Sequence, residues 1–139
     1  MANLFSFILC DNLNNFQQGP NGPIPMLISP QLALRPPFIP GTFSFGMAVG
    51  INDVNVHTPN KMKVTIKTPD GKVIYDSGET ELPISPDEDT SLPTEYQGFM
   101  MNIDIRNLPI EKEGAYYFTF LVNGKEVGTK LVPIYKKGQ

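Results

Sequence analysis

The chain contains one cysteine, Cys10, and one histidine, His57, so a nucleophile–base pair would have to combine these two side chains. A thiolate nucleophile needs a base within hydrogen-bonding reach, and nothing local in the sequence brings the two residues together. Cys10 ends an apolar segment, where a thiol acts as a small hydrophobic side chain. His57 lies among turn-forming residues, which favours a solvated loop position. We therefore expect no catalytic residue and predict that the protein is not an enzyme.

Metal binding has few candidate ligands in this chain. Zinc needs three or four nitrogen or sulfur ligands, which one histidine and one cysteine cannot supply. Calcium takes six to eight oxygens, and the triplet Asp87-Glu88-Asp89 with Asp70 or Asp76 could offer carboxylates from loops. The alternative is a solvated acidic loop, because consecutive acids point apart and no D-x-D-x-D-G loop is present. We favour the solvated loop and expect no metal and no cofactor.

Aromatic and acidic residues suggest an alternative function, a module that binds carbohydrate or another small ligand. A separate activity, glycoside hydrolysis, would need a pair of carboxylates, for which Asp104 and Glu113 are candidates because they flank the same predicted strands. Four tyrosines could stack on sugars from an exposed face: Tyr75, Tyr96, Tyr117 and Tyr135. The chain has no tryptophan and no polar cluster beside these tyrosines, so this function rests on fold analogy alone.

The composition predicts a single domain over residues 1–139, long enough to bury a hydrophobic core. A net charge of −3 gives no electrostatic reason to bind nucleic acid. The apolar run at residues 4–10 is too short for a signal peptide or a membrane span. A single cysteine excludes an internal disulfide and fits a reducing compartment. We therefore expect a cytoplasmic protein without membrane contact, with a phage particle as the alternative carrier.

Charge is distributed unevenly along the chain. Residues 1–60 hold three charged side chains, Asp11, Arg35 and Asp53, and residues 61–139 hold the other 22 of the 25. One interpretation places the N-terminal strands centrally, with their loops lying flat on the fold. The other interpretation is that another chain covers part of this half, because interface cores are depleted in charge.

The segment 114–132 predicts a β-hairpin around which the rest must pack. Asn123-Gly124 is the strongest short hairpin signal, because both central residues of a type I′ turn need positive φ. A two-residue turn there predicts one apolar face made of three facing pairs: Phe120 and Val127, Phe118 and Thr129, Tyr116 and Leu131. The other face is mostly polar, so a second sheet must cover the apolar one.

Alternating and apolar segments predict the remaining strands at residues 4–10, 26–34, 42–51, 61–67, 72–75 and 99–106, with a short edge strand within 79–84. Because Pro30 lacks an N–H group, we expect the strand at 26–34 to lie at a sheet edge or to contain a bulge. Pro69-Asp70-Gly71 predicts a hairpin turn. Loops are expected elsewhere: a turn at 11–15, an exposed loop at 17–25 and a long acidic loop at 76–96. Residues 35–41 should cross in extended form, with Phe38 and Ile39 filling one end of the core.

Seven or eight short strands without helical periodicity predict an all-β fold, an antiparallel two-sheet β-sandwich. The run Gly114-x-Tyr116-x-Phe118 resembles the penultimate strand of immunoglobulin-like domains, in which a tyrosine pins a corner. Phe118 stands where the second cysteine of those domains would be, so the resemblance concerns topology only.

A broader similarity spans nearly the whole chain and rests mostly on turn motifs. These are Cys10-Asp11, Pro36-Pro37-Phe38-Ile39-Pro40, Pro69-Asp70-Gly71, Asn107-Leu108-Pro109-Ile110, Glu113-Gly114-Ala115-Tyr116 and Asn123-Gly124-Lys125-Glu126-Val127-Gly128. In these the chain resembles a family of small uncharacterised bacterial and phage proteins expected to be β-sandwiches. The resemblance implies no known activity and assigns no functional residue.

The strand at residues 42–51 suggests how the protein acts. One of its faces carries large apolar residues, and the other carries nothing larger than threonine: Thr42, Ser44, Gly46, Ala48 and Gly50. Small residues either lie under solvent or permit close approach of another backbone. We predict a non-catalytic protein that works by binding or assembly, with a protein partner or as a homodimer formed through the charge-poor half. Ala48→Arg and Ser44→Lys should then disrupt the dimer.

Overall fold

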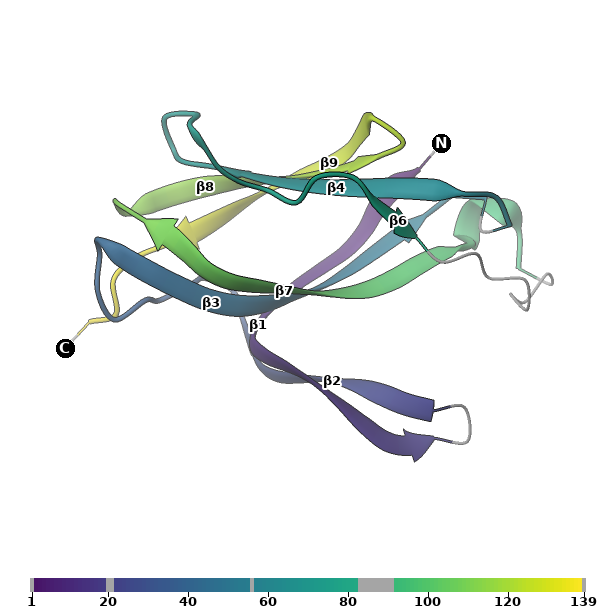
Figure 1. The fold of residues 1–139 in the computed structure, drawn as a ribbon, viewed down its shortest axis with the longest axis horizontal. Coiled ribbons are helices and arrows are strands. Elements are labelled where there is room, and N and C mark those ends of the chain that lie inside the picture. The colour runs from purple at the N-terminus through teal and green to yellow at the C-terminus, as the bar shows by residue number, and fades with distance from the viewer. Residues whose placement is uncertain (1, 20–21, 56, 83–91, 139) are drawn as a thin grey trace.

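The computed structural model describes residues 2–19, 22–55, 57–82 and 92–138, and it shows two antiparallel β-sheets packed face to face (Figure 1). The strands are β1 Asn3–Gly19, β2 Gly22–Gln31, β3 Gly41–Asn52, β4 Asn60–Lys67, β5 Val73–Asp76, β6 Thr80–Leu82, β7 Gly98–Ile110, β8 Gly114–Val122 and β9 Lys125–Ile134. Sheet A has the order β2-β1-β3-β7; sheet B has the order β5-β4-β8-β9, and β6 also pairs with β4. The predicted antiparallel β-sandwich is confirmed. The described residues form nine strands rather than seven or eight, because the short edge strand expected within residues 79–84 forms as β6.

The core lies between the inner faces of the two sheets, as the alternation predicts. Tyr116, Phe118 and Phe120 of β8 are completely buried. Phe7 of β1 packs its ring edge-on against two of them, with centroid distances of 6.0 Å to Phe118 and 5.6 Å to Phe120. From β3 the predicted large face is buried at Phe45, Met47, Val49 and Ile51. Burial of this apolar surface is the main force holding the sheets together.

The closing hairpin turns where predicted but changes register beyond its turn. Asn123 and Gly124 have φ values of 52° and 81°, as a type I′ turn requires. Val122 pairs with Lys125, but a bulge then inserts one extra residue in β9, so that Phe120 pairs with Gly128. The predicted facing pairs are therefore wrong by one residue. Because a one-residue shift moves a side chain to the opposite face, Leu131 is 59% exposed and Val132 is buried in its place.

The N-terminal hairpin is much longer than the sequence predicted. A turn at 11–15 and a loop at 17–25 were expected, but β1 continues to Gly19 and β2 begins at Gly22. The asparagines that favour turns are held in a strand by the β2 ladder, which overrides a local preference. β3 pairs with β1 from Asn3 to Cys10 only, and β2 pairs with β1 from Leu9 onward. Residues 11–19 and 22–29 thus form a two-stranded ribbon, here called the arm, which projects from sheet A away from sheet B (Figure 1).

The strand β7 lies at the opposite edge of sheet A from the arm. It extends past the predicted residues 99–106, and its pairing with β3 contains a bulge between Phe43 and Phe45. Asn107 has a φ of 55° there, and its backbone N–H donates to Ser44 Oγ at 2.9 Å. Ser44 therefore has a structural role in this bulge.

The crossing segment at residues 35–41 was predicted only in part. Ile39 packs against the core, but Phe38 is 71% exposed, so the prediction that both fill the core is wrong for Phe38. Arg35 anchors this segment, because its guanidinium donates to the backbone carbonyls of Tyr135 and Lys136, each at 3.0 Å. These bonds to the C-terminal segment hold the chain in place, so Phe38 need not enter the core.

The β4–β5 turn contains the predicted Pro69-Asp70-Gly71 motif, with Gly71 at a φ of 93°. Lys112 Nζ lies 2.8 Å from the Asp70 carboxylate, and the Thr68 hydroxyl donates to the same group. These hydrogen bonds favour the ionised form and lower the pKa of Asp70 from 3.8 to about 2, the bond from Lys112 having the larger effect.

We expect this pair to make stability depend on acid pH in a defined window. The unfolded carboxyl titrates near pH 3.9, so the stabilisation is complete above about pH 4 and is lost as the pH falls to about 2. The stability difference between wild type and Asp70→Asn, measured by urea unfolding, should shrink across that range and should also shrink with salt. In Lys112→Ala, the NMR-titrated pKa of Asp70 should move back toward 3.8; an unchanged pKa contradicts the assignment.

Candidate functional site

The structure keeps Cys10 and His57 apart. Cys10 is buried and pairs with Gly46 near the middle of β3, whereas His57 is exposed in the loop after β3 ends at Asn52. Gly46 and Asn52 are six residues apart along the strand, which corresponds to about 20 Å. The backbone N–H of His57 donates to Asn55 Oδ1 at 3.0 Å within its own loop. The two residues therefore do not form a nucleophile–base pair.

The carboxylates considered for calcium act separately. The triplet Asp87-Glu88-Asp89 lies outside the described residues. Asp70 binds Lys112, and Asp76 accepts the backbone N–H of Gly78 at 2.8 Å and lies 3.4 Å from Lys63 Nζ. The bond from Gly78, followed by Lys63, lowers the pKa of Asp76. Within the described part of the chain, no group of three His, Cys, Asp or Glu side chains could hold a metal ion.

The residues considered for carbohydrate chemistry are also dispersed. Asp104 forms an ion pair with Arg106 at 2.8 Å, and Glu113 accepts the backbone N–H of Lys136 at 2.8 Å. The tyrosines belong to different regions: Tyr75 to β5, Tyr96 to η1 (Thr94–Tyr96), Tyr117 to β8, and Tyr135 to the segment after β9. Tyr75, Tyr96 and Tyr117 each line a different hollow, so the tyrosines do not form one surface on which a sugar could stack.

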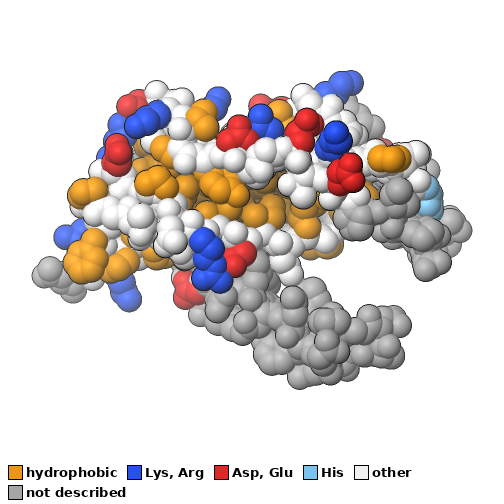
Figure 2. Space-filling model, viewed as in Figure 1, with side chains coloured by type: hydrophobic (Ala, Val, Ile, Leu, Met, Phe, Trp, Pro, Cys, Tyr) orange, Lys and Arg blue, Asp and Glu red, His pale blue; other side chains and the backbone are white. Residues whose placement is uncertain are grey.

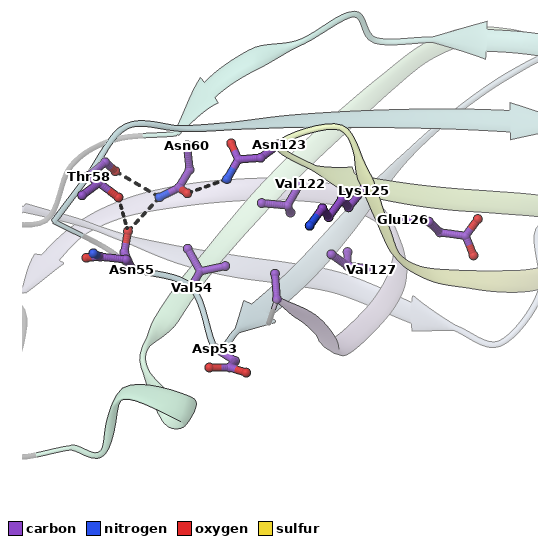
Figure 3. A pocket seen from close by; sticks show the side chains of 11 residues that line it. Asp53, Val54, Asn55, Thr58, Asn60, Val122, Asn123, Lys125, Glu126 and Val127 are labelled. Atoms are coloured by element: carbon purple, nitrogen blue, oxygen red, sulfur yellow. Dashed lines mark hydrogen bonds between the residues drawn. The ribbon is translucent and has the colours of Figure 1, made fainter.

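A hollow of about 370 Å³ lies at one end of the sandwich, between the β3–β4 loop and the β8–β9 turn (Figure 3). The buried Asn60 occupies its wall and donates to the carbonyls of Asn55 at 2.8 Å and Thr58 at 3.0 Å. Asn123 Nδ2 donates in turn to Asn60 Oδ1 at 2.9 Å. The amide groups are thus engaged with one another, and every buried side-chain polar atom in the described residues has a partner. This network holds two loops together and engages the side-chain amides of Asn60 and Asn123 in hydrogen bonds within the protein.

A second hollow of about 430 Å³ runs between the sheets along β7. Figure 2 shows hydrophobic side chains gathered between the two sheets on this side of the molecule. We call it the edge groove; it is lined by Met62, Val64, Tyr75, Ser77, Thr80, Leu82, Met101, Asn102, Ile103 and Asp104. Of the described strands, only β3 pairs with β7, so the outer edge of β7, which borders the groove, has no paired strand among the described residues. The sequence predicted β7 as an amphipathic strand. It could not predict that β7 lies at the edge of its sheet, because strand order depends on pairings between distant segments.

The small-residue face of β3 is buried at Gly46, Ala48 and Gly50, whereas Thr42 is exposed. Ser6 of β1 and Met100 of β7 reach across Gly50 and contact each other at 3.9 Å. Ala48 is only 5% exposed, while Ile8 on β1 and Met100 are 41% and 70% exposed. At Ala48 and Gly50, therefore, this face is covered within the chain rather than exposed to solvent. Ala48→Arg would disturb the monomer itself, and so would Ser44→Lys because Ser44 accepts the N–H of the β7 bulge. Neither substitution isolates an interface.

Comparison with known proteins assigns the chain to a family without assigning a function. In the described residues, no helix is long and apolar enough to cross a membrane. No curated protein matches the chain. One family matches residues 6–134, which is nearly the whole sandwich including the arm. The chain therefore belongs to DUF6941, a family of unknown function.

Proposed function

We propose that this chain is a non-catalytic β-sandwich that works by assembly, with the arm as its contact element and a second copy as its partner. The observation that carries this proposal is the pairing of residues 11–19 with β2 alone, beyond the point where β3 leaves β1. A two-stranded ribbon without a covering sheet is marginally stable in water. Contact with another surface would stabilise it.

The charge distribution supports a protein surface as that contact. Residues 12–34 contain no charged side chain, although charged residues make up 18% of the chain. An arm that stays in water would gain no stability from lacking charged residues. In the core of an interface, the lack of charge avoids the cost of removing charged groups from water. Ile8 and Met100 extend the uncharged surface on the outer face of sheet A. The charge-poor half is thus the part of the chain suited to assembly.

We further infer an immunoglobulin-like topology for the sandwich, in a cytoplasmic bacterial or phage setting. Two observations support the topology. Strands β1-β3-β7 face β5-β4-β8-β9, and the Tyr116 hydroxyl donates to the carbonyl of Lys112 at 2.7 Å, which is the contact of a tyrosine corner. A carbohydrate-binding module, the alternative function, has less support because the four tyrosines are dispersed.

Removal of the arm tests the proposed function. Replacing residues 12–29 with a single glycine leaves Asp11-Gly as a two-residue turn between Cys10 and Pro30, which already face each other. We call this the arm-less variant. Wild type should form an oligomer at micromolar concentration in multi-angle light scattering, and the arm-less variant should be monomeric.

Two controls make this result interpretable. Circular dichroism and thermal melting must show that the arm-less variant retains the folded sandwich. Leu131→Lys serves as a surface control, because Leu131 is exposed on β9 in the other sheet and the substitution should leave the oligomer intact. A wild type that stays monomeric at high micromolar concentration overturns the proposal, and so does an arm-less variant that associates as strongly as wild type.

A further inference from the structure

We infer that the edge groove and the open edge of β7 form the acceptor for the arm of a second copy, which adds to sheet A as an extra strand. This inference rests on the proposed function and names the surface that the arm binds. Strand addition of this kind obtains affinity from main-chain hydrogen bonds and selectivity from alternate side chains that enter a groove.

The first half of β7 lacks the features that normally protect an edge strand. Natural edges are guarded by charges, prolines or bulges, which prevent another strand from pairing. In β7 all of these lie in the second half: the charged pair Asp104 and Arg106, the bulge at Asn107, and Pro109. Residues 98–103 carry no charge. This half of the strand is therefore open to pairing.

The edge groove provides the surface that side chains of an added strand would contact. Met101 and Ile103 of β7 are only partly buried, and Tyr75 and Leu82 are partly buried on the opposite wall. A strand paired to β7 points every second side chain toward the space between the sheets. Insertion there would remove these apolar side chains from water, which stabilises the complex by the hydrophobic effect.

The arm matches this acceptor in charge and in backbone. Its β2 strand contains Pro23, Pro25 and Pro30, which lack N–H groups and suit an edge that stays unpaired. The β1 strand of the arm has no proline, and beyond Asp11 it has no charge. Its side opposite β2 has no described neighbour once β3 ends its pairing at Cys10. Residues 12–19 of β1 are therefore the donor strand, and a neutral strand suits the uncharged half of β7.

Geometry requires the donor and the acceptor to come from different molecules. The order β2-β1-β3-β7 places the arm and the open edge of β7 at opposite edges of sheet A, with the body of β1 and β3 between them. Figure 1 shows the arm directed away from the sandwich. Each chain thus carries one donor strand and one acceptor edge, so the donor of each copy can bind the acceptor of another. This stoichiometry identifies a second copy as the occupant.

A lysine in the groove tests the acceptor. Ile103→Lys places an inward-pointing charge on the edge strand, which is a natural device against strand addition. In the monomer its methylenes can stay in the groove while the ammonium reaches water, so melting should show a folded protein. Association should weaken at least tenfold relative to wild type and to Leu131→Lys, measured by sedimentation velocity. An oligomer that persists in folded Ile103→Lys overturns this inference and leaves the proposed function standing.

Mixing two variants gives a sharper result. The arm-less variant keeps the groove, and Ile103→Lys keeps the arm, so each should be monomeric alone and the equimolar mixture should form a heterodimer. A mixture of the arm-less variant with the Ile103→Lys arm-less double variant should stay monomeric. If the first mixture forms no heterodimer, the arm does not bind the intact groove and the inference fails. If wild type itself is monomeric, this inference and the proposed function fail together.

Discussion

Gly98→Ala is expected to destabilise the protein by at least about 3 kcal/mol. In a variant that another substitution already destabilises, it should abolish folding. Gly98 begins β7 one residue after the end of η1 and pairs with Asn52 of β3. A Cβ at this position would lie 1.8 Å from the carbonyl oxygen of Ile51 and 2.7 Å from the Cα of Asn52. These are backbone atoms of a central strand, so the clash can be relieved only by displacing the β3–β7 ladder.

Two other glycines serve as matched controls for Gly98→Ala. At Gly50 a Cβ would meet Ser6 Oγ at 2.4 Å and Met100 Sδ at 2.8 Å, which are side-chain atoms that can rotate away. At Gly138 nothing lies within 4 Å. Urea unfolding followed by circular dichroism should therefore rank the loss of stability as Gly98→Ala, then Gly50→Ala, with Gly138→Ala unchanged. A Gly98→Ala variant as stable as wild type would show that β7 enters the sheet differently.

Asn123→Ala is expected to cost about 2–4 kcal/mol of folding free energy, from two separable causes. The first is conformational: Asn123 has a φ of 52°, which asparagine tolerates and alanine does not. The second is the loss of hydrogen bonds shown in part in Figure 3: Asn123 Oδ1 accepts the backbone N–H of Lys61 at 2.9 Å, and its Nδ2 donates to the buried Asn60. Without Asn123 the Asn60 oxygen would be buried without a donor.

Two further substitutions separate these causes. Asn123→Gly removes the hydrogen bonds but accepts the positive φ, so its free energy of unfolding should fall between wild type and Asn123→Ala. Asn123→Asp keeps an acceptor for the Lys61 N–H and loses only the donor to Asn60. Chemical denaturation of the three variants measures the order directly. If Asn123→Ala and Asn123→Gly are equally stable, the positive φ is not a cause of the destabilisation. If Asn123→Gly is as stable as wild type, the lost hydrogen bonds are not a cause.

Several features of the fold could be predicted because they depend on neighbouring residues only. The turn at Asn123-Gly124 follows from the positive φ that these two residues accept. The buried face of β8 follows from the alternation of Tyr116, Phe118 and Phe120 with more polar residues. The position of Pro30 on an edge strand follows from its missing N–H. In each case the controlling preference lies within a few residues of the position concerned.

Other features could not be predicted because they depend on contacts between distant segments. Residues 11–15 have the composition of a turn, yet they extend as a strand because the β2 ladder satisfies their backbone. Leu131 is exposed because one bulge near Val127 reverses the facing of the rest of β9. The small face of β3 is covered at Gly50 because Ser6 and Met100, from the two flanking strands, meet over that residue.

The amino-acid sequence by itself determined that this is an all-β sandwich, which strands bury their apolar faces and that the first 60 residues carry little charge. These properties are sums of local preferences and composition. The tertiary structure decided where that charge-poor segment lies: part of it is a central strand, and part projects as the arm. It also decided that β7 is an edge beside an apolar groove. Strand order is set by pairings far apart in the sequence, so the donor and the acceptor proposed here exist only in the folded chain.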